Sequence, residues 1–425
     1  MAETAIIIKP GRDKPIINQH PWIFSGAIRG MEGIPEQGEI VNVRAHDRAF
    51  LGQGYWNVNS QIRVRMLSWD KDPIDDRWWR NALKRAIDAR LSLTDADHNA
   101  ERLPCRLINA ESDFIPGLVV DAFEDVANNK LWLSLQALTL GIDVHKKMIA
   151  HHLVELLQEY AGMSMVAGIY ERNDVDAREK EGLRQHKGVL WGEEPPERIQ
   201  ILHSPDIYYW VDIKNGHKTG TYLDQRRNHD FVLDFVNSQQ NLKPTPNKKY
   251  EVLNLFSYTG VFGLAAWSDE TTYITNVDSS NEALAIAEAN VALNPEMVSE
   301  NFEFVQADVF EYQRAMVNQG RQWDFVILDP PKFAHSKQQI DRASRGYKDI
   351  NLNALHLIKP GGYLMTFSCS GAITPDLFQK IVFGALVDSG RQAQVIHHLG
   401  ASDDHPVALT FPEGEYLKGL LLRIY

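Results

Sequence analysis

The feature that most constrains the fold is a strict alternation of strand-like and helix-like segments from about residue 250 onward. Short apolar runs such as YEVLNLF (250–256) and WDFVILD (323–329) alternate with segments of helical periodicity such as SNEALAIAEANVALN (280–294). Apolar strands that alternate with helices predict a parallel sheet covered on both faces. The last two strand candidates, QAQVIHH (392–398) and YLKGLLLRIY (416–425), have no helix between them, so the final strand should enter antiparallel. We therefore predict a seven-stranded, Rossmann-like α/β domain.

The chain before this domain is organised differently. Residues 1–72 contain short strands with Gly-rich joints, among them the alternating run IRVRMLSW (62–69), and predict a small all-β barrel. Residues 73–100 contain a linker helix, and residues 101–205 mix strands with one amphipathic helix, which predicts a central α+β domain. We place the α/β domain at 206–425 and expect a hairpin turn at Asn215–Gly216, between YYWVDIK and HKTGTYL.

Composition excludes several classes of protein. With 44% hydrophobic and 24% charged residues the chain resembles folded soluble proteins, and its net charge of −12 argues against a non-specific polyanion binder. Residues 1–75 are neutral, with nine basic and nine acidic residues. Four arginines there (Arg44, Arg48, Arg63 and Arg65) are typical either of phosphate contacts or of a solvated strand face. Two cysteines provide neither a disulfide framework nor a metal-ligand pair, so we expect no metal. We see no signal peptide or membrane span and expect a cytoplasmic protein.

In parallel sheets, ligands bind at the carboxyl ends of the strands. The first turn, Asn254 to Gly263, has two glycines that let backbone approach a ligand, but no G-x-G-x-x-G. A cofactor without a pyrophosphate needs fewer glycines, which favours S-adenosylmethionine over NAD. Asp278 ends the next strand and is suited to accept ribose hydroxyls, while Ser279 and Glu282 form a capping box. Asp308 ends the third strand, where an adenine amino group would lie.

The fourth and fifth strand ends carry the groups suited to chemistry on a base. Asp329 begins the rigid sequence DPPKF (329–333), whose Lys332 is placed to contact phosphate or base. Cys369 lies in FSCSG (367–371) at the next strand end. Cytosine C5 becomes nucleophilic only after a thiolate adds to C6, while an acid such as Asp329 neutralises N3. A lone cysteine is more often a small buried hydrophobe, but the strand-end position favours the nucleophile.

Several motifs in the chain resemble the large-subunit ribosomal RNA methyltransferase I family. They are HPWIFSGAI (20–28), RLINAESDFIPGLVVD (106–121), TGTYLDQR (219–226), NLFSYTGVFG (254–263), VDSS (277–280), QADVF (306–310), DPPKF (329–333), FSCSG (367–371) and DHP (404–406). The resemblance runs from one end of the chain to the other.

The resemblance implies an N-terminal PUA RNA-binding domain, a central α+β domain and a class I S-adenosylmethionine-dependent methyltransferase domain. The implied reaction is methylation of cytosine C5 in 23S rRNA, as free rRNA or as a large-subunit precursor, with Cys369 as nucleophile and Asp329 holding the base. The sequence leaves the oligomeric state open, a homodimer included. The cofactor would be held by Asp224, Gln225, Arg226, Asn254, Phe256, Tyr258, Gly260, Asp278, Ser279, Asp308, Val309 and Asp329.

One departure leaves a step of the reaction open. Many RNA cytosine-5 methyltransferases have a second cysteine in the DPP loop, and this chain has Lys332 there, so Lys332, a water or another group must complete the reaction. Close relatives that methylate guanine N7 lack the cysteine. The alternatives to cytosine methylation are therefore methylation of another rRNA base, such as guanine, and a non-catalytic RNA-binding ribosome assembly factor.

Two further features are open between an RNA-binding and a structural role. Arg172 and Arg178 lie in YERNDVDAREKEGL (170–183), which is typical either of an RNA contact or of a charged helix start. The Trp78–Trp79 pair is suited to stacking on bases, although packing of the linker helix is the better interpretation.

Overall fold

The computed structural model describes residues 4–94, 104–160, 164–203, 207–242, 249–334 and 336–425. The chain divides into two compact units. Unit 1 comprises Met1–Ile201, Val211–Leu223 and Asp403–Gly414, and unit 2 comprises Leu202–Trp210, Asp224–Ser402 and Glu415–Tyr425. The domain limits drawn from the sequence stay a prediction.

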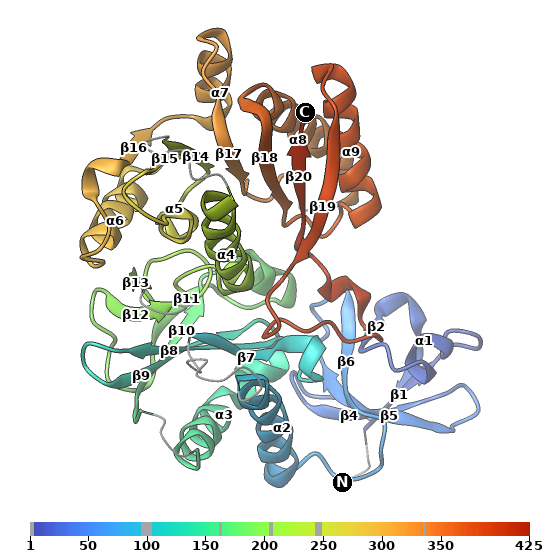
Figure 1. Cartoon of the computed structure of the whole chain (residues 1–425). Coiled ribbons are helices and arrows are strands. Elements are labelled where there is room, and N and C mark those ends of the chain that lie inside the picture. Colours follow the sequence, from blue (N-terminus) through green and yellow to red (C-terminus); the bar gives the residue numbers. More distant parts are fainter. Residues whose placement is uncertain (1–3, 95–103, 161–163, 204–206, 243–248, 335) are drawn as a thin grey trace. The chain divides into compact units, whose positions relative to one another are not determined.

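Unit 1 begins with a six-stranded sheet in the order β2-β6-β5-β4-β1-β3 (Figure 1). Its strands are β1 (Ala5–Ile8), β2 (Trp22–Phe24), β3 (Ile28–Glu32), β4 (Ile40–Arg44), β5 (Phe50–Trp56) and β6 (Ile62–Ser68), with the short helix α1 (Lys14–Ile17) between β1 and β2. Alternate residues point into one core, which includes Ile6, Val41, Val43 and Val64. The all-β fold predicted for the N-terminal region is confirmed.

A five-stranded sheet in the order β11-β10-β9-β8-β7 forms the rest of unit 1. Its strands are β7 (Cys105–Asn109), β8 (Leu118–Asp125), β9 (Lys130–Ala137), β10 (Val166–Asn173) and β11 (His186–Gly192). The helices α2 (Asp76–Thr94) and α3 (Leu140–Gln158) contribute buried apolar side chains to the core of this sheet. Strands β9 and β10 are parallel and are joined through α3, so the region is α+β as predicted.

Unit 2 contains a seven-stranded sheet in the order β16-β15-β14-β17-β18-β20-β19. Its strands are β14 (Tyr250–Leu255), β15 (Thr272–Asp278), β16 (Phe302–Gln306), β17 (Trp323–Leu328), β18 (Ile358–Ser368), β19 (Ala393–Gly400) and β20 (Lys418–Ile424). The first five strands are parallel, and β20 runs antiparallel to both β18 and β19. The predicted Rossmann-like sheet is confirmed.

Helices cover both faces of this sheet, as the continuous apolar strands require (Figure 1). They are α4 (Arg226–Leu242), α5 (Val261–Ala266), α6 (Asn281–Ala292), α7 (Val309–Asn318), α8 (Ile340–His356) and α9 (Pro375–Ser389). Strand β17 shows how the faces separate. Phe325 lies against Phe235 of α4, at 5.5 Å between ring centroids, whereas its neighbour Val326 belongs to the cluster with α8 and α9.

The hairpin predicted at Asn215–Gly216 is wrong. Strand β13 (Ile207–Val211) pairs with β12 (Ile199–His203), and residues 212–222 form turns rather than a returning strand. The Asp212 carboxylate accepts hydrogen bonds from the backbone N–H groups of Lys214 and Asn215, at 2.9 and 2.8 Å. This local cap satisfies the donors that a hairpin ladder would have used.

Within the described residues, no helix is both long and apolar enough to span a bilayer.

Candidate active site

The five parallel strands of unit 2 end at one edge of the sheet. Leu255 of β14 is in register with Val277 of β15 and Leu328 of β17, and Leu328 is in register with Thr366 of β18. The loops after these strands therefore begin side by side. The sequence-predicted groups at 254–260, 278, 308, 329 and 369 all lie on this edge or next to it, where α/β sheets bind ligands.

The loop between β14 and α5 is held in an unusual backbone conformation. Phe256, Tyr258 and Gly260 all have positive φ, at 59°, 49° and 77°. The left-handed conformation costs a non-glycine residue about 1–2 kcal/mol, so the surrounding contacts must impose it. Asn254, which is buried at the strand end, donates a hydrogen bond to Asn276 Oδ1 at 2.8 Å and fixes the base of the loop.

Asp278 connects this loop to the next strand end. Its carboxylate accepts the backbone N–H of Tyr258 at 2.8 Å and that of Ser280 at 2.9 Å, and the side chain is half-buried. Each carboxylate oxygen can accept more than one hydrogen bond, so Asp278 can hold the loop and still accept ligand hydroxyls. The helix cap predicted at Ser279 is wrong by one residue, because Ser280 Oγ accepts the N–H of Ala283 at 3.1 Å.

The two glycines of this loop serve close packing. A Cβ on Gly263 would lie 2.5 Å from Asn276 Oδ1, and a Cβ on Gly260 would lie 2.9 Å from the Cβ of Ala287 in α6. Both contacts are shorter than van der Waals distance, so the glycines let α5 approach strand β15 and helix α6. This role is additional to the backbone approach to a ligand that the sequence suggested.

Asp308 and Val309 begin helix α7 after β16. The exposed Asp308 is the N-cap, whose carboxylate accepts the N–H of Glu311 at 3.1 Å, while Val309 is buried. The capping bond uses one carboxylate oxygen and fixes the orientation of the group. Its other oxygen is a candidate partner for an amino group at this edge.

The segment before α4 contributes polar side chains that lie around Asp329. The buried Gln225 donates from Nε2 to Asp329 Oδ2 at 3.0 Å and accepts a hydrogen bond from Asn228 at 2.6 Å. Asp224, also buried, accepts the Tyr416 hydroxyl at 2.7 Å. Arg226 is half-buried at the start of α4. The DQR segment thus orients the half-buried carboxylate of Asp329.

Cys369 lies in the loop directly after β18 and is half-buried. Its sulfur is 3.9 Å from the carbonyl oxygen of Pro330, in the loop that follows Asp329. The next residue, Ser370, is buried, and its hydroxyl accepts the N–H of Ala334 at 3.1 Å and lies 2.9 Å from the Tyr347 hydroxyl. These bonds tie the cysteine loop to the loop after β17 and fix where the thiol lies.

Lys418 is a residue of this site that the sequence reasoning missed. Its side chain is buried, and Nζ donates to the carbonyl oxygens of Ser370 at 2.8 Å and Ile373 at 2.6 Å. Burial lowers the pKa of Lys418 to about 8, partly opposed by the nearby Cys369 and Glu415. The sequence feature that could have identified Lys418 is a lysine inside the apolar strand YLKGLLLRIY, because a buried lysine needs a specific partner.

Other predicted groups lie in different environments. Lys332 is exposed in the loop after β17. Cys105, the other cysteine, is only 3% exposed in β7 of unit 1 and belongs to the apolar core.

Several arginines considered for RNA contacts form structural ion pairs in unit 1. Arg65 is buried and pairs with Glu111 at 2.8 Å and Glu181 at 3.0 Å. Arg178 is buried too and pairs with Asp143, while Arg172 pairs with Asp174 and donates to the Ile213 carbonyl oxygen. A buried guanidinium that is already paired cannot contact phosphate without breaking that pair. Arg65 is therefore not on a solvated strand face, and Arg172 lies within β10 rather than at a helix start, whereas Arg178 lies in the 3-10 helix Asp176–Glu181 as the charged-helix alternative expected.

Comparison with known proteins identifies a known domain family in the N-terminal region and another in the C-terminal region of the chain. Residues 6–69 match a family of PUA-like domains, and residues 185–423 match the S-adenosylmethionine-dependent methyltransferases. The ribosomal RNA large subunit methyltransferase I of Shewanella amazonensis is 42% identical over 99% of both chains, and that of Aeromonas salmonicida is 41% identical over 98% of both. The chain belongs to the ribosomal RNA large subunit methyltransferase I family. The predicted family membership is confirmed.

Solved structures confirm the fold of this family member. A structure from Streptococcus mutans assigned as a SAM-dependent methyltransferase has a TM-score of 0.77 at 20% identity, covering 99% of both chains. A second methyltransferase structure, complexed with SAH, has a TM-score of 0.78 at 19% identity over the same share.

The cofactor of the family is S-adenosylmethionine, and the residues of unit 2 suit it. The half-buried Asp278 has carboxylate oxygens suited to accept hydroxyl groups at a strand end, and the Tyr258 N–H bond to it holds the loop Phe256–Gly260 beside this carboxylate. The strand-end edge of the sheet has carboxylates at Asp278, Asp308 and Asp329. Their negative charge matches a cationic sulfonium, and their oxygens can accept hydrogen bonds from the several donors of an adenosine.

Proposed function

We propose that this protein transfers a methyl group from S-adenosylmethionine to C5 of a cytosine in large-subunit rRNA through a covalent adduct with Cys369. The observation that carries the proposal is the position of that thiol. It is half-buried after β18, 3.9 Å from the Pro330 carbonyl oxygen, in a loop held by the ammonium of Lys418. Methylation of a ring nitrogen needs no such nucleophile, because the nitrogen already carries a lone pair.

The reaction begins with the Cys369 thiolate. Its sulfur adds to C6 of a cytosine that has been flipped out of its helix, and the electron pair of the C5–C6 double bond moves into the ring. The carboxyl group of Asp329, oriented by Gln225, neutralises the charge that develops at N3. S-adenosylmethionine, when bound, supplies the electrophilic methyl group to which C5 then bonds.

Elimination completes the cycle. A base removes the proton from C5, the C5–C6 double bond forms again, and the C6–S bond breaks to release the thiolate. The proton that Asp329 gave to N3 returns to that carboxylate, and 5-methylcytidine is released. The candidates for the base are the exposed Lys332 on the one hand and a water molecule or another group on the other. A Lys332→Met variant separates them. If Lys332 is the base, a methylated, denaturant-stable protein–RNA adduct accumulates, whereas a water base leaves turnover unchanged.

We assign Lys418 the role of positioning Cys369 and favouring its thiolate. The ammonium donates to two carbonyl groups of the cysteine loop, at Ser370 and Ile373, so it fixes the loop and places a positive charge near the sulfur. A nearby cation favours the thiolate over the thiol. Because Lys418 acts through the loop, it is a positioning residue and does not take part in bond making.

The test is methyl transfer from labelled S-adenosylmethionine to rRNA purified from a strain that lacks the gene. The wild-type protein should produce 5-methylcytidine in large-subunit rRNA, and Cys369→Ala should produce none. Formation of a methylated guanosine by both proteins would instead support the guanine alternative. Absence of any transfer by the wild type would support a non-catalytic assembly factor.

A further inference from the structure

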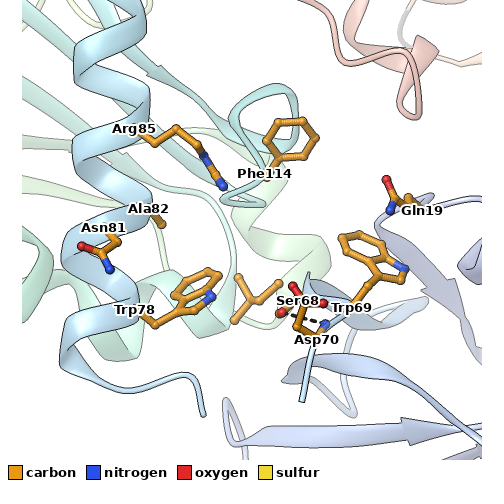
Figure 2. A pocket seen from close by; sticks show the side chains of 10 residues that line it. Gln19, Ser68, Trp69, Asp70, Trp78, Asn81, Ala82, Arg85 and Phe114 are labelled. Carbon is orange, nitrogen blue, oxygen red and sulfur yellow. Dashed lines mark hydrogen bonds between the residues drawn. The ribbon is translucent and has the colours of Figure 1, made fainter. Parts of the chain in front are cut away.

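A pocket of about 560 Å³ lies in unit 1 and is lined by residues of that unit alone (Figure 2). Three segments supply its walls: the end of β6 with the turn after it, one face of α2, and the loop around Phe114. Its volume is within the range of about 300–1,000 Å³ that small-molecule sites occupy. The walls combine aromatic rings with amide, carboxylate and guanidinium groups.

Helix α2 presents one continuous face to this pocket. Trp78, Asn81, Ala82 and Arg85 all line it, and their spacing of three, four and seven residues puts them on the same side of the helix (Figure 2). The next residue, Trp79, is 1% exposed and stacks on His145, with ring centroids 5.1 Å apart. Trp79 thus anchors the helix, while Trp78 remains half-buried at the pocket wall.

The opposite wall is rigid. The Trp69 indole N–H donates to the Ile16 carbonyl oxygen at 2.7 Å, which fixes the ring beside the pocket. Gln53 Nε2 donates to the carbonyl oxygens of Asp70 and Asp72 at 3.0 and 2.8 Å, and the Asp70 N–H donates to Ser68 Oγ at 3.0 Å. The turn after β6 is therefore formed before any ligand binds.

Phe114 is the C-cap of the short 3-10 helix Ala110–Asp113, and its N–H donates to the Glu111 carbonyl oxygen at 3.1 Å, which accounts for its backbone conformation but not for the exposure of its ring. It is 45% exposed and has a φ of 62°, a left-handed conformation that is an outlier for a bulky side chain. The guanidinium of Arg85 lies 5.4 Å from its ring centroid. An exposed aromatic ring paired with a cation at a pocket points to a ligand with a flat face.

We infer that this pocket binds one unstacked base of single-stranded rRNA and so helps to select the substrate of the proposed methyl transfer. Single-stranded RNA is recognised by stacking on aromatic rings and arginine planes and by hydrogen bonds to base edges. Trp78 and Phe114 supply rings, Arg85 a plane with a charge, and Asn81 an amide for a base edge. Two walls come from the PUA-like region and the helix that follows it.

The inference rests on rRNA being the substrate, and the sharpest variant is Phe114→Asn. Asparagine tolerates positive φ, so the substitution removes the ring without adding backbone strain. Phe383→Asn is the matched control, since Phe383 is an exposed phenylalanine on α9 of unit 2. Trp78→Ala and Arg85→Met test the other two groups.

The measurement is the dissociation constant of the full-length protein for rRNA purified from a strain without the gene, at fixed salt. Loss of a stacked base weakens binding by about five- to 150-fold, so we expect this range for Phe114→Asn and Trp78→Ala. Phe383→Asn should stay within about twofold. Photocrosslinking of the wild type to the same rRNA should give nucleotide adducts on peptides that contain Trp78 or Phe114.

Three outcomes overturn the inference: affinities of all pocket variants within twofold of the wild type, crosslinks that fall elsewhere only, or weaker binding to assembled subunits with unchanged binding to purified rRNA. The last would assign the pocket to a ribosomal protein. The proposed methyl transfer is judged separately, from 5-methylcytidine formation at saturating rRNA. If the wild type showed no methyl transfer but the pocket variants still bound rRNA more weakly than the wild type, the inference about the pocket would stand and the proposed catalysis would be rejected.

Discussion

The two cysteines of this chain lie in opposite kinds of environment. Cys105 is in the middle of the apolar cluster of unit 1, on strand β7, whereas Cys369 is half-buried in a loop directly after β18. Cys105 packs among aliphatic side chains, while Cys369 lies among hydrogen-bonded serines and near a buried lysine. Cys105 is itself the first residue of β7, so the contrast shows that a half-buried position after the carboxyl end of a strand, rather than the residue type, makes a thiol available for chemistry.

The largest effect should be seen in methyl transfer. Cys369→Ala should lower the rate at least about a thousandfold, because the nucleophile that starts the reaction is gone. Cys105→Ala should keep the rate within about twofold at a temperature where it remains folded. Equal losses in the two variants, measured with labelled cofactor and rRNA, would show that the cysteines do not differ in role.

A second difference should appear in thiol reactivity. Iodoacetamide should alkylate Cys369 of the native protein about a hundredfold faster than Cys105, since a 3%-exposed core thiol reacts only after local opening. Mass spectrometry of the modified peptides gives both rates in one sample. Comparable rates in the folded protein would contradict the environments described above.

Removal of the Lys418 charge should reduce this reactivity about tenfold near pH 7. Burial lowers the pKa of Lys418 to about 8, so its ammonium is mostly present at pH 7 and mostly lost by pH 9. The ratio of alkylation rates between the wild type and Lys418→Met should therefore be largest near pH 7 and approach one above pH 9. Glu415 and Lys332 also act on this lysine, and both stay in place in the variant.

Lys418→Arg keeps the charge and should recover part of the reactivity, while Lys380→Met on the exposed side of α9 is the control for loss of a lysine. A ratio that stays constant from pH 6.5 to 9.5 would mean that Lys418 acts on the loop structure alone.

The smallest effect concerns the free energy of unfolding, and here the substitution of Cys105 should have the larger effect of the two. Cys105→Ser places a hydroxyl in an apolar core and should lower the free energy of unfolding by about 1–3 kcal/mol. Cys369→Ser should change it by no more than about 0.5 kcal/mol, as for other partly exposed sites. Urea unfolding monitored by tryptophan fluorescence measures both. A larger loss for Cys369→Ser would make that thiol part of the core.

The sequence predicted the parts of this site that depend on local order. Strand periodicity located the ends after Leu255, Asp278, Leu328 and Ser368, and parallel strands necessarily bring such ends to one edge. Two finer predictions were wrong because nearby side chains capped the backbone N–H groups in a different way. Asp212 caps a turn where a hairpin was expected, and the N-cap of α6 is Ser280 instead of Ser279.

Features that depend on distant partners could not be predicted. Lys418 meets the cysteine loop only because β20 pairs antiparallel with β18, which sets Lys418 opposite Ser368. Arg65 is neutralised by Glu111 and Glu181, which are 46 and 116 residues away in the chain. Periodicity carries no information about such pairs.

The central claim is that Cys369 forms a covalent bond to cytosine C6 during methylation of C5. Its most direct test uses rRNA in which cytidine is replaced by 5-fluorocytidine, because a fluorine at C5 cannot be removed as a proton and the adduct cannot eliminate. With S-adenosylmethionine, the wild type and Cys105→Ala should each form a denaturant-stable protein–RNA complex that carries one methyl group. Cys369→Ala should form none. A complex with Cys369→Ala, or no complex with a wild type that methylates normal rRNA, would contradict the mechanism.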